Sequence, residues 1–213
     1  MQTEYLMKFL GNSPSCFHAV KNIKETLKAS GFCELREDEK WPLESGRGYF
    51  VTRNGSSIIA FVVPEKTESA HIFAAHSDSP SFKIKPSPEM EGGGKTVRLN
   101  IEKYGGMLTA TWFDRPLTAA GRILIQKDGK LAEKLVYIDK DILIIPSLAI
   151  HMDREANDKP RSNVQTDMPP LFATIDALKT EDGRFPKGAF LEMIARETQV
   201  EAKDICASDL FLT

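Results

Sequence analysis

The sequence lacks several features that would place it in a specialised class of protein. Its 213 residues contain only three cysteines, Cys16, Cys33 and Cys206, an odd number without paired spacing. This count argues against a disulfide framework or a zinc knuckle and predicts reduced thiols in a cytoplasmic protein. Basic residues are not in excess, because 28 Lys and Arg stand against 30 Asp and Glu and give a net charge of −2. We therefore expect no nucleic-acid partner.

Long apolar runs are also absent. The longest, residues 58–63 and 142–145, are far shorter than the roughly 20 residues of a membrane-spanning helix. The N-terminus shows neither the basic nor the apolar region of a signal peptide. What is present is an ordinary globular composition, 41% hydrophobic and 27% charged. We expect a globular protein without a membrane partner.

The first part of the chain predicts an α/β arrangement. Two amphipathic helices are indicated, and the second begins after Ser15 and ends at Gly31. Strand-like runs at 48–52 and 57–63 flank an Asn-Gly pair, the strongest short signal for a hairpin. The apolar run 70–76 follows and predicts a strand that is buried on both faces and ends at His76.

Beyond residue 86 the pattern changes to short strands. Two prolines and three glycines at 86–94 mark a boundary, and the glycines are expected at a hairpin tip. Alternating runs at 96–101, 107–113, 121–126, 134–138 and 141–145 predict an all-β barrel or sandwich. A polar loop over 153–167 and a helix with Phe190 and Ile194 on one face come next, and 205–212 reads as another strand.

His76 and Asp78 are the first candidates for chemistry. Ligands gather at the carboxyl ends of strands in open α/β sheets, and His76 ends a predicted strand. One ring nitrogen of the histidine can bind a metal while Asp78 accepts the other N–H and fixes the tautomer. The alternative is a histidine that simply pairs with a local aspartate in a turn. The pattern therefore indicates one ligand of a metal site, and the alternative of a histidine that pairs with an aspartate in a turn stays open.

The other histidines give weaker signals. His18 on a helix face and His71 within the predicted buried strand favour structural roles. His151 follows an apolar run and precedes a charged cluster, which leaves a functional role and a surface role equally open. Asp114 and Arg115 lie at a predicted strand end, where a local salt link or a turn is expected.

Four stretches carry a resemblance to a known family. They are SPSCFHAV at 13–20, HSDSPSFKIKP at 76–86, YGG at 104–106 with TWFDRPL at 111–117, and IPSLAIHMDRE at 145–155. In order and spacing they resemble the aspartyl aminopeptidase family of zinc metallo-aminopeptidases, which includes vacuolar aminopeptidase I. The resemblance covers essentially the whole chain.

The resemblance implies an α/β fold in two parts and an assembly. Residues 1–86 would be the N-terminal part of a zinc-peptidase α/β catalytic domain, and 87–200 an inserted β-rich dimerisation domain. Residues 201–213 would begin the return to the catalytic domain. Family members act on peptides, remove N-terminal and often acidic residues, and assemble as homo-oligomers of twelve subunits.

The resemblance also implies roles for three residues. His76 would be a zinc ligand, and Asp78 the catalytic-site carboxylate that orients it. His151 would reach the active site of a neighbouring subunit and contact bound substrate there. The complete active site would hold two zinc ions.

The chain departs from the family in one respect. Family members are much longer, and their second half supplies the remaining zinc ligands and the general base. A catalytic zinc needs three protein ligands, of which this chain offers one. Its apolar end looks cut, so we expect the N-terminal half of a zinc aminopeptidase that is inactive alone. A non-catalytic scaffold or regulatory module that pairs with full-length subunits is the alternative, and a split enzyme is a third possibility.

Overall fold

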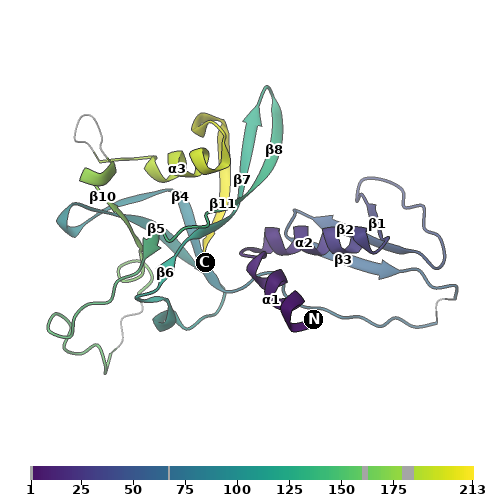
Figure 1. Cartoon of the computed structure of the whole chain (residues 1–213), viewed down its shortest axis with the longest axis horizontal. Coiled ribbons are helices and arrows are strands. Elements are labelled where there is room, and N and C mark those ends of the chain that lie inside the picture. Colours follow the sequence, from purple (N-terminus) through teal and green to yellow (C-terminus); the bar gives the residue numbers. More distant parts are fainter. Residues whose placement is uncertain (1, 67, 160–162, 179–184) are drawn as a thin grey trace. The chain divides into compact units, whose positions relative to one another are not determined.

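A computed structural model of the chain describes residues 2–66, 68–159, 163–178 and 185–213 (Figure 1). The chain divides into two compact units, Met1–Ser79 and Pro80–Thr213, and each is described by itself. The expected boundaries at residues 86 and 200 concern catalytic and dimerisation roles and remain predictions. Both units mix helices with sheets, which confirms the predicted α/β class.

The first unit holds two helices and a three-stranded sheet. Its elements are α1 (Gln2–Gly11), α2 (Cys16–Ala29), β1 (Cys33–Leu35), β2 (Gly48–Arg53) and β3 (Ser57–Val62). β1 runs parallel to β2, and β2 runs antiparallel to β3. Asn54 and Gly55 close the β2–β3 hairpin with φ values of 53° and 62°, so the predicted hairpin is confirmed. The short strand β1 was not anticipated.

The core of this unit forms on both faces of its sheet. Phe50 on β2 is fully buried, and Phe17 and Val20 of α2 are buried as well. Tyr49 and Val51 alternate with Phe50 along the strand and therefore occupy the opposite face, where they form a second small cluster. α2 supplies apolar side chains at helical spacing, as the sequence predicted.

Residues 70–76 do not form the predicted buried strand. They are irregular, and their side chains are exposed, with Ile72 at 86% and Phe73 at 96%. His71 is exposed too, so its expected place in a core was wrong. A strand buried on both faces needs neighbouring strands to accept its backbone hydrogen bonds. In the part of the chain that the structure describes, no strand pairs with this segment.

The second unit is built on one eight-stranded sheet. In chain order it contains β4 (Ser81–Gly92), η1 (Gly93–Lys95), β5 (Thr96–Tyr104), η2 (Thr109–Trp112), β6 (Pro116–Leu117), β7 (Ala119–Lys127), β8 (Lys130–Tyr137), β9 (Leu143–Ile144), β10 (Leu171–Thr174), η3 (Asp176–Leu178), α3 (Ala189–Thr198), η4 (Ala202–Asp204) and β11 (Ile205–Leu212). The strand order is β6-β9-β10-β5-β4-β11-β7-β8, and all neighbours are antiparallel. Most predicted strands and the predicted helix are present.

This sheet curls upon itself. β6 is the first strand in the sheet order and β7 the last but one, yet the single residue Thr118 joins them. The two ends of the sheet must therefore approach each other. The barrel alternative describes this unit better than the sandwich. The strand predicted at 107–113 was wrong, because a 3₁₀ turn occupies residues 109–112.

A row of alternating charges crosses four adjacent strands of the curled sheet. Lys83 on β4 pairs with Asp209 on β11 at 2.9 Å. Arg122 on β7 pairs with Asp209 at 3.0 Å and with Glu133 on β8 at 2.7 Å. Arg122 is the most buried member, with only 9% of its side chain exposed. Two carboxylates thus accept hydrogen bonds from the buried Arg122 guanidinium, and the ion pairs connect β4, β11, β7 and β8.

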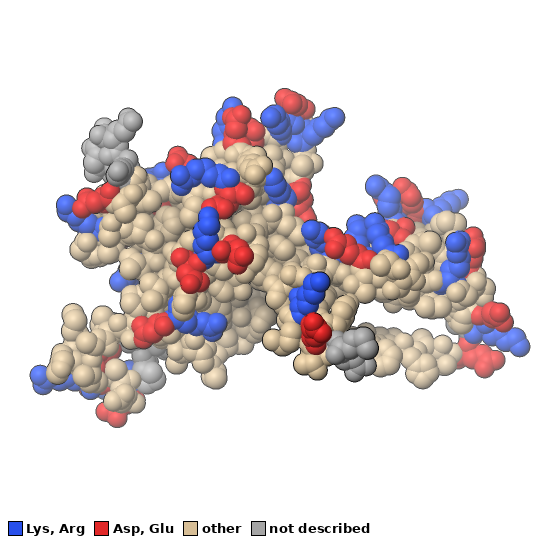
Figure 2. Space-filling view, in the orientation of Figure 1, with Lys and Arg blue, Asp and Glu red and all other residues tan. Residues whose placement is uncertain are grey.

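The surface carries mixed charge. Figure 2 shows blue and red side chains interspersed over the visible face, in line with the nearly balanced charge of the sequence. Among the described residues, none of the helices combines the length and the apolar character that a membrane span requires.

Candidate active site

His76 and Asp78 lie together in the irregular segment that ends the first unit. The His76 Nδ1 and the Asp78 Oδ1 are 3.0 Å apart, within hydrogen-bond distance. The His76 ring is 91% exposed, whereas the Asp78 side chain is 32% exposed. With Nδ1–H donated to the carboxylate, Nε2 carries the lone pair and faces solvent. This tautomer would leave Nε2 able to accept a further bond.

A second hydrogen bond anchors this segment to the sheet. The Ser77 hydroxyl donates to the Ser56 carbonyl at 2.8 Å, and Ser56 belongs to the turn of the β2–β3 hairpin. The hairpin turn thus fixes the backbone between His76 and Asp78 although no strand does. Sequence spacing predicted the contact between the two side chains but could not predict this anchor.

These residues alone do not fit a catalytic zinc. Such an ion takes three protein ligands and keeps one open position. In the described part of the chain, no group of three or more His, Cys, Asp or Glu side chains could hold a metal ion. The role of His76 as a zinc ligand stays a prediction.

His151 lies in the second unit, on an exposed turn after β9. The turn is closed by the Met152 N–H, which donates to the Ala149 carbonyl at 2.8 Å. Its apolar neighbours are unusually exposed, with Leu148 at 41%, Ile150 at 47% and Met152 at 74%. His151 and these apolar side chains are therefore accessible to solvent on one segment of the chain.

Asp114 is a residue of this region whose role sequence reasoning missed. Its carboxylate accepts the Ser147 N–H at 2.9 Å and the Ser147 hydroxyl at 2.5 Å, instead of pairing with Arg115. These two hydrogen bonds lower the pKa of Asp114 below its ordinary value. Asp114 adopts a positive φ of 56°. The residues are 33 positions apart, so no local pattern could reveal the contact.

The chain matches known proteins along nearly all of its length. The family described as Aminopeptidase I zinc metalloprotease (M18) matches residues 9–213. The Probable M18 family aminopeptidase 2 of Clostridium novyi (strain NT) is 44% identical over 97% of this chain and 48% of the relative. The chain thus spans about half the length of this curated relative.

Solved structures share the fold. A chain in the cryo-EM structure of the Ape4 and Nbr1 complex matches with a TM-score of 0.86 and 35% identity, covering 96% of this chain and 42% of that one. Chaetomium thermophilum mApe1 matches with a TM-score of 0.81 and 28% identity over 99% of this chain and 50% of that one. The mApe1 of S. cerevisiae, described as a dodecamer, matches with a TM-score of 0.72 and 22% identity over 98% and 47% of the two chains.

The four stretches that resembled this family in the sequence therefore identified it correctly. The family model matches all but the first eight residues of the chain. The chain belongs to the M18 family of aminopeptidase I zinc metalloproteases.

Proposed function

We propose that this chain is the N-terminal half of a zinc-dependent aminopeptidase that removes N-terminal residues, acidic ones in particular, from peptides. Alone it hydrolyses nothing. The observation that carries the proposal is the contact of the exposed His76 with Asp78 at 3.0 Å, together with the lack, among the described residues, of a group of three or more side chains that could hold a metal ion. Family membership and the half-length match with the Clostridium novyi relative support the same assignment.

In the complete enzyme the active site holds two zinc ions, and His76 binds one of them. Asp78 keeps the His76 ring in the required tautomer. His151 contacts the substrate in the active site of a neighbouring subunit of a homo-oligomer. Its exposed turn and exposed apolar neighbours support a position at a contact between subunits. The protein acts in the cytoplasm, where its three cysteines remain reduced.

The test is a chimera in which this chain is fused to the second half of the Clostridium novyi relative. We expect it to release N-terminal residues from peptides in a reaction that a chelator stops. His76→Ala should abolish this activity and lower the zinc content. His71→Ala is the matched control, because His71 is an exposed histidine on the same segment and has no assigned role.

The unfused chain provides the second half of the test. It should show no peptidase activity with added zinc. Chelator-sensitive activity of the unfused chain would contradict the proposal, and so would a chimera whose turnover and zinc content are unchanged by His76→Ala. His151→Ala in the chimera should lower turnover and leave the zinc content unchanged.

A second candidate function is a non-catalytic module that pairs with full-length subunits. The exposed apolar side chains beside His151, at Leu148, Ile150 and Met152, favour it because they could contact an intact subunit. Co-expression with a full-length M18 aminopeptidase should then yield a mixed oligomer. Replacing Met152 by Lys should prevent its formation.

A further inference from the structure

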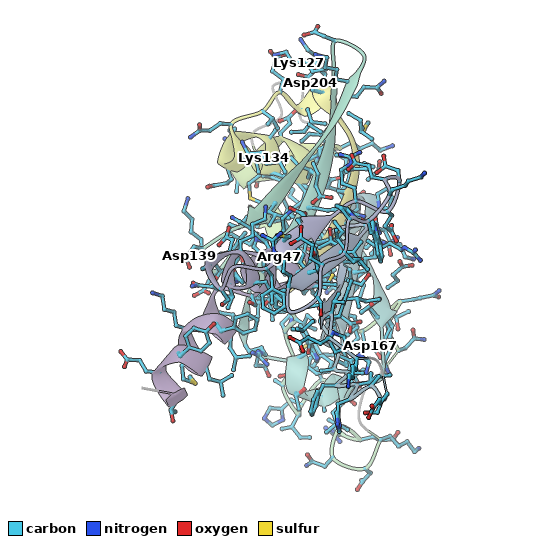
Figure 3. The ribbon with its side chains drawn as sticks, turned by 90° about the vertical axis from the view of Figure 1, so that its right-hand side faces the viewer. Arg47, Lys127, Lys134, Asp139, Asp167 and Asp204 are labelled. Atoms are coloured by element: carbon cyan, nitrogen blue, oxygen red, sulfur yellow. The ribbon has the colours of Figure 1, made fainter. Side chains whose placement is uncertain are left out.

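The eight-stranded sheet opens between β4 and β11, and a pocket lies in the opening. Leu210 on β11 pairs with Ile84 on β4, whereas nearer the start of β11 no described residues of the two strands pair. Residues of β4, of β11 and of the start of α3 line the pocket, whose volume of about 320 Å³ is within the range of ligand pockets. In Figure 3 Asp204, just before β11, lies near Lys127 at the end of β7. The pocket extends from its closed end at Leu210 toward this end of β11.

Prolines keep β4 apart from β11 here. Continuing the β4–β11 pairing by two residues would bring Ser208 opposite Pro86, which has no N–H to donate. Ser87 follows with a positive φ of 49°, and the pairing of β4 with β5 shifts register over the same residues. Beyond this bulge the Glu89 carboxylate accepts the Phe190 N–H at 2.8 Å, which holds β4 against the start of α3. The opening is therefore a fixed feature of the sheet.

β11 turns unpaired backbone groups toward the pocket. Thr213 and Thr118 exchange both backbone hydrogen bonds, at 2.9 and 3.1 Å, which sets the alternation along β11. The backbone groups of Asp209 therefore face β7, and the N–H and C=O of Ser208 face the β4 side. In the part of β4 that the structure describes, no residue pairs with Ser208. An unpaired strand edge accepts an added strand, so the opening fits an extended peptide.

Lys85 decides which end of the peptide enters. Lys24 and Lys83 are half-buried and each pairs with a carboxylate, whereas the half-buried Lys85 has no such partner among the described residues. Lys85 lines the pocket and directly follows Ile84, whose pairing with Leu210 closes the opening. An added strand must therefore end there. Lysine attracts a C-terminal carboxylate at that position and repels an N-terminal ammonium, and its flexible four-carbon stem lets it reach the bound chain end.

The rest of the wall is largely apolar. Phe190 is only 2% exposed and packs edge-to-face on Phe172 at 5.6 Å, so this side of the pocket is rigid. Leu191 lines the pocket next to it. We infer that the pocket binds the C-terminal end of an extended peptide that runs parallel to β11 and has an apolar last residue. Its backbone pairs with Ser208 and its carboxylate with Lys85. The inference does not rest on the proposed function.

Three short peptides test the inference on the unmodified chain. Each carries an N-terminal fluorescein, which also blocks removal of the first residue. One ends in Val-Leu with a free carboxylate, the second is its C-terminal amide, and the third ends in Val-Gly with a free carboxylate. Fluorescence anisotropy should show binding of the first and about tenfold or weaker binding of the others, because each lacks one contact. A first peptide that binds no better than either of the others, or not at all up to the solubility limit of the chain, would overturn the inference.

Variants of Lys85 test the carboxylate contact. Lys85→Met should lower the affinity for the free acid about tenfold, to that for the amide, and leave the affinity for the amide unchanged. Lys103→Met is the matched control, since Lys103 is an exposed lysine on the neighbouring strand β5 that does not line the pocket. Lys85→Arg keeps the charge and should keep the preference for the acid. A folded Lys85→Met that still prefers the acid would refute the assignment.

Variants of Ser208 test the backbone contact. Ser208→Pro removes the N–H that faces the pocket and should weaken binding of the free acid about fivefold or more. Ser208→Ala is the matched control, because it loses the hydroxyl and keeps that N–H, so binding should be unchanged. Urea midpoints establish that both variants fold, and where Ser208→Pro does not fold the Lys85 variants decide. Unchanged binding in a folded Ser208→Pro would contradict strand addition. None of these outcomes affects the proposed function, because no catalysis is measured.

Discussion

Replacing Arg122 by Met should destabilise the second unit through the two carboxylates that it leaves behind. Arg122 is 9% exposed and lies between Asp209 on β11 and Glu133 on β8. The methionine fills much of the same space, so the principal change is the loss of charge-assisted hydrogen bonds rather than a cavity. After the substitution Asp209 keeps Lys83 as a partner, and Glu133 loses the pairing with Arg122.

The expected magnitude follows from the exposure of the partners. Removing one member of a fully buried ion pair costs about 3–5 kcal/mol. Here the Asp209 and Glu133 side chains are 30% and 38% exposed, so water solvates part of the uncompensated charge. We therefore expect a loss of about 1–3 kcal/mol in the free energy of unfolding. The exposed pair Lys140–Glu197 serves as control, and Lys140→Met should cost about 0–1 kcal/mol.

Urea unfolding followed by tryptophan fluorescence can measure this in the second unit alone. The chain has two tryptophans, so a Trp41→Phe background leaves Trp112, which packs edge-to-face on Phe82 at 5.1 Å, as the reporter. The reasoning is refuted if Arg122→Met costs no more than Lys140→Met. It is also refuted if the effects of Arg122→Met and Asp209→Asn are simply additive, because contacting partners must couple.

The same variant should change the response to acid. Burial raises the pKa of Asp209, but the hydrogen bonds from Lys83 and Arg122 outweigh it and lower the pKa overall. Stability from this carboxylate is therefore fully present above its unfolded pKa of about 3.9 and is lost as the pH falls through the lower folded value. The difference between the wild type and Arg122→Met should shrink over that acid range.

Three further predictions concern other parts of the chain. Gly121→Ala should disrupt the pairing of β7 with β11, because a Cβ at this glycine would lie 1.9 Å from a carbonyl oxygen of β11. Gly93→Ala is its control and should leave the free energy of unfolding in urea nearly unchanged, since the space around its Cβ is open. Burial lowers the pKa of His18, so wild-type stability should fall as the pH drops below about 6.5, and His18→Gln should lose less between pH 7.5 and 5.5. Phe82→Ala should cost about 3–5 kcal/mol because this ring is fully buried, whereas Phe73→Ala, at an exposed ring, should leave the urea midpoint unchanged.

Elements with local signals were predictable from the sequence. The β2–β3 hairpin follows from Asn54-Gly55, whose backbone preferences suit a tight turn, and the end of α2 follows from Gly31 with its φ of 83°. The strand predicted at 70–76 failed because burial is a property of the neighbours as well as of the segment. The segment is apolar, as a buried strand would be, but no strand of the described chain pairs with it.

In the candidate site, too, local contacts were predictable from the sequence and long-range contacts were not. The contact between His76 and Asp78 was predictable because two residues of sequence separation bring the side chains within reach. The hydrogen bonds from Ser147 to the Asp114 carboxylate were not predictable, because they depend on how the chain after η2 meets the end of β9 in the folded sheet.

The exposed segment at 70–75 has a consequence for handling the protein. Ala-His-Ile-Phe-Ala-Ala contains no Asp, Glu, Lys, Arg, proline or glycine, and it displays Ile72 and Phe73 to solvent. Short segments of this composition stack between copies as cross-β structure when their backbone is unpaired. The chain should therefore form thioflavin-positive aggregates with a lag time that shortens at higher concentration, and Phe73→Lys should delay them by charge repulsion between stacked copies.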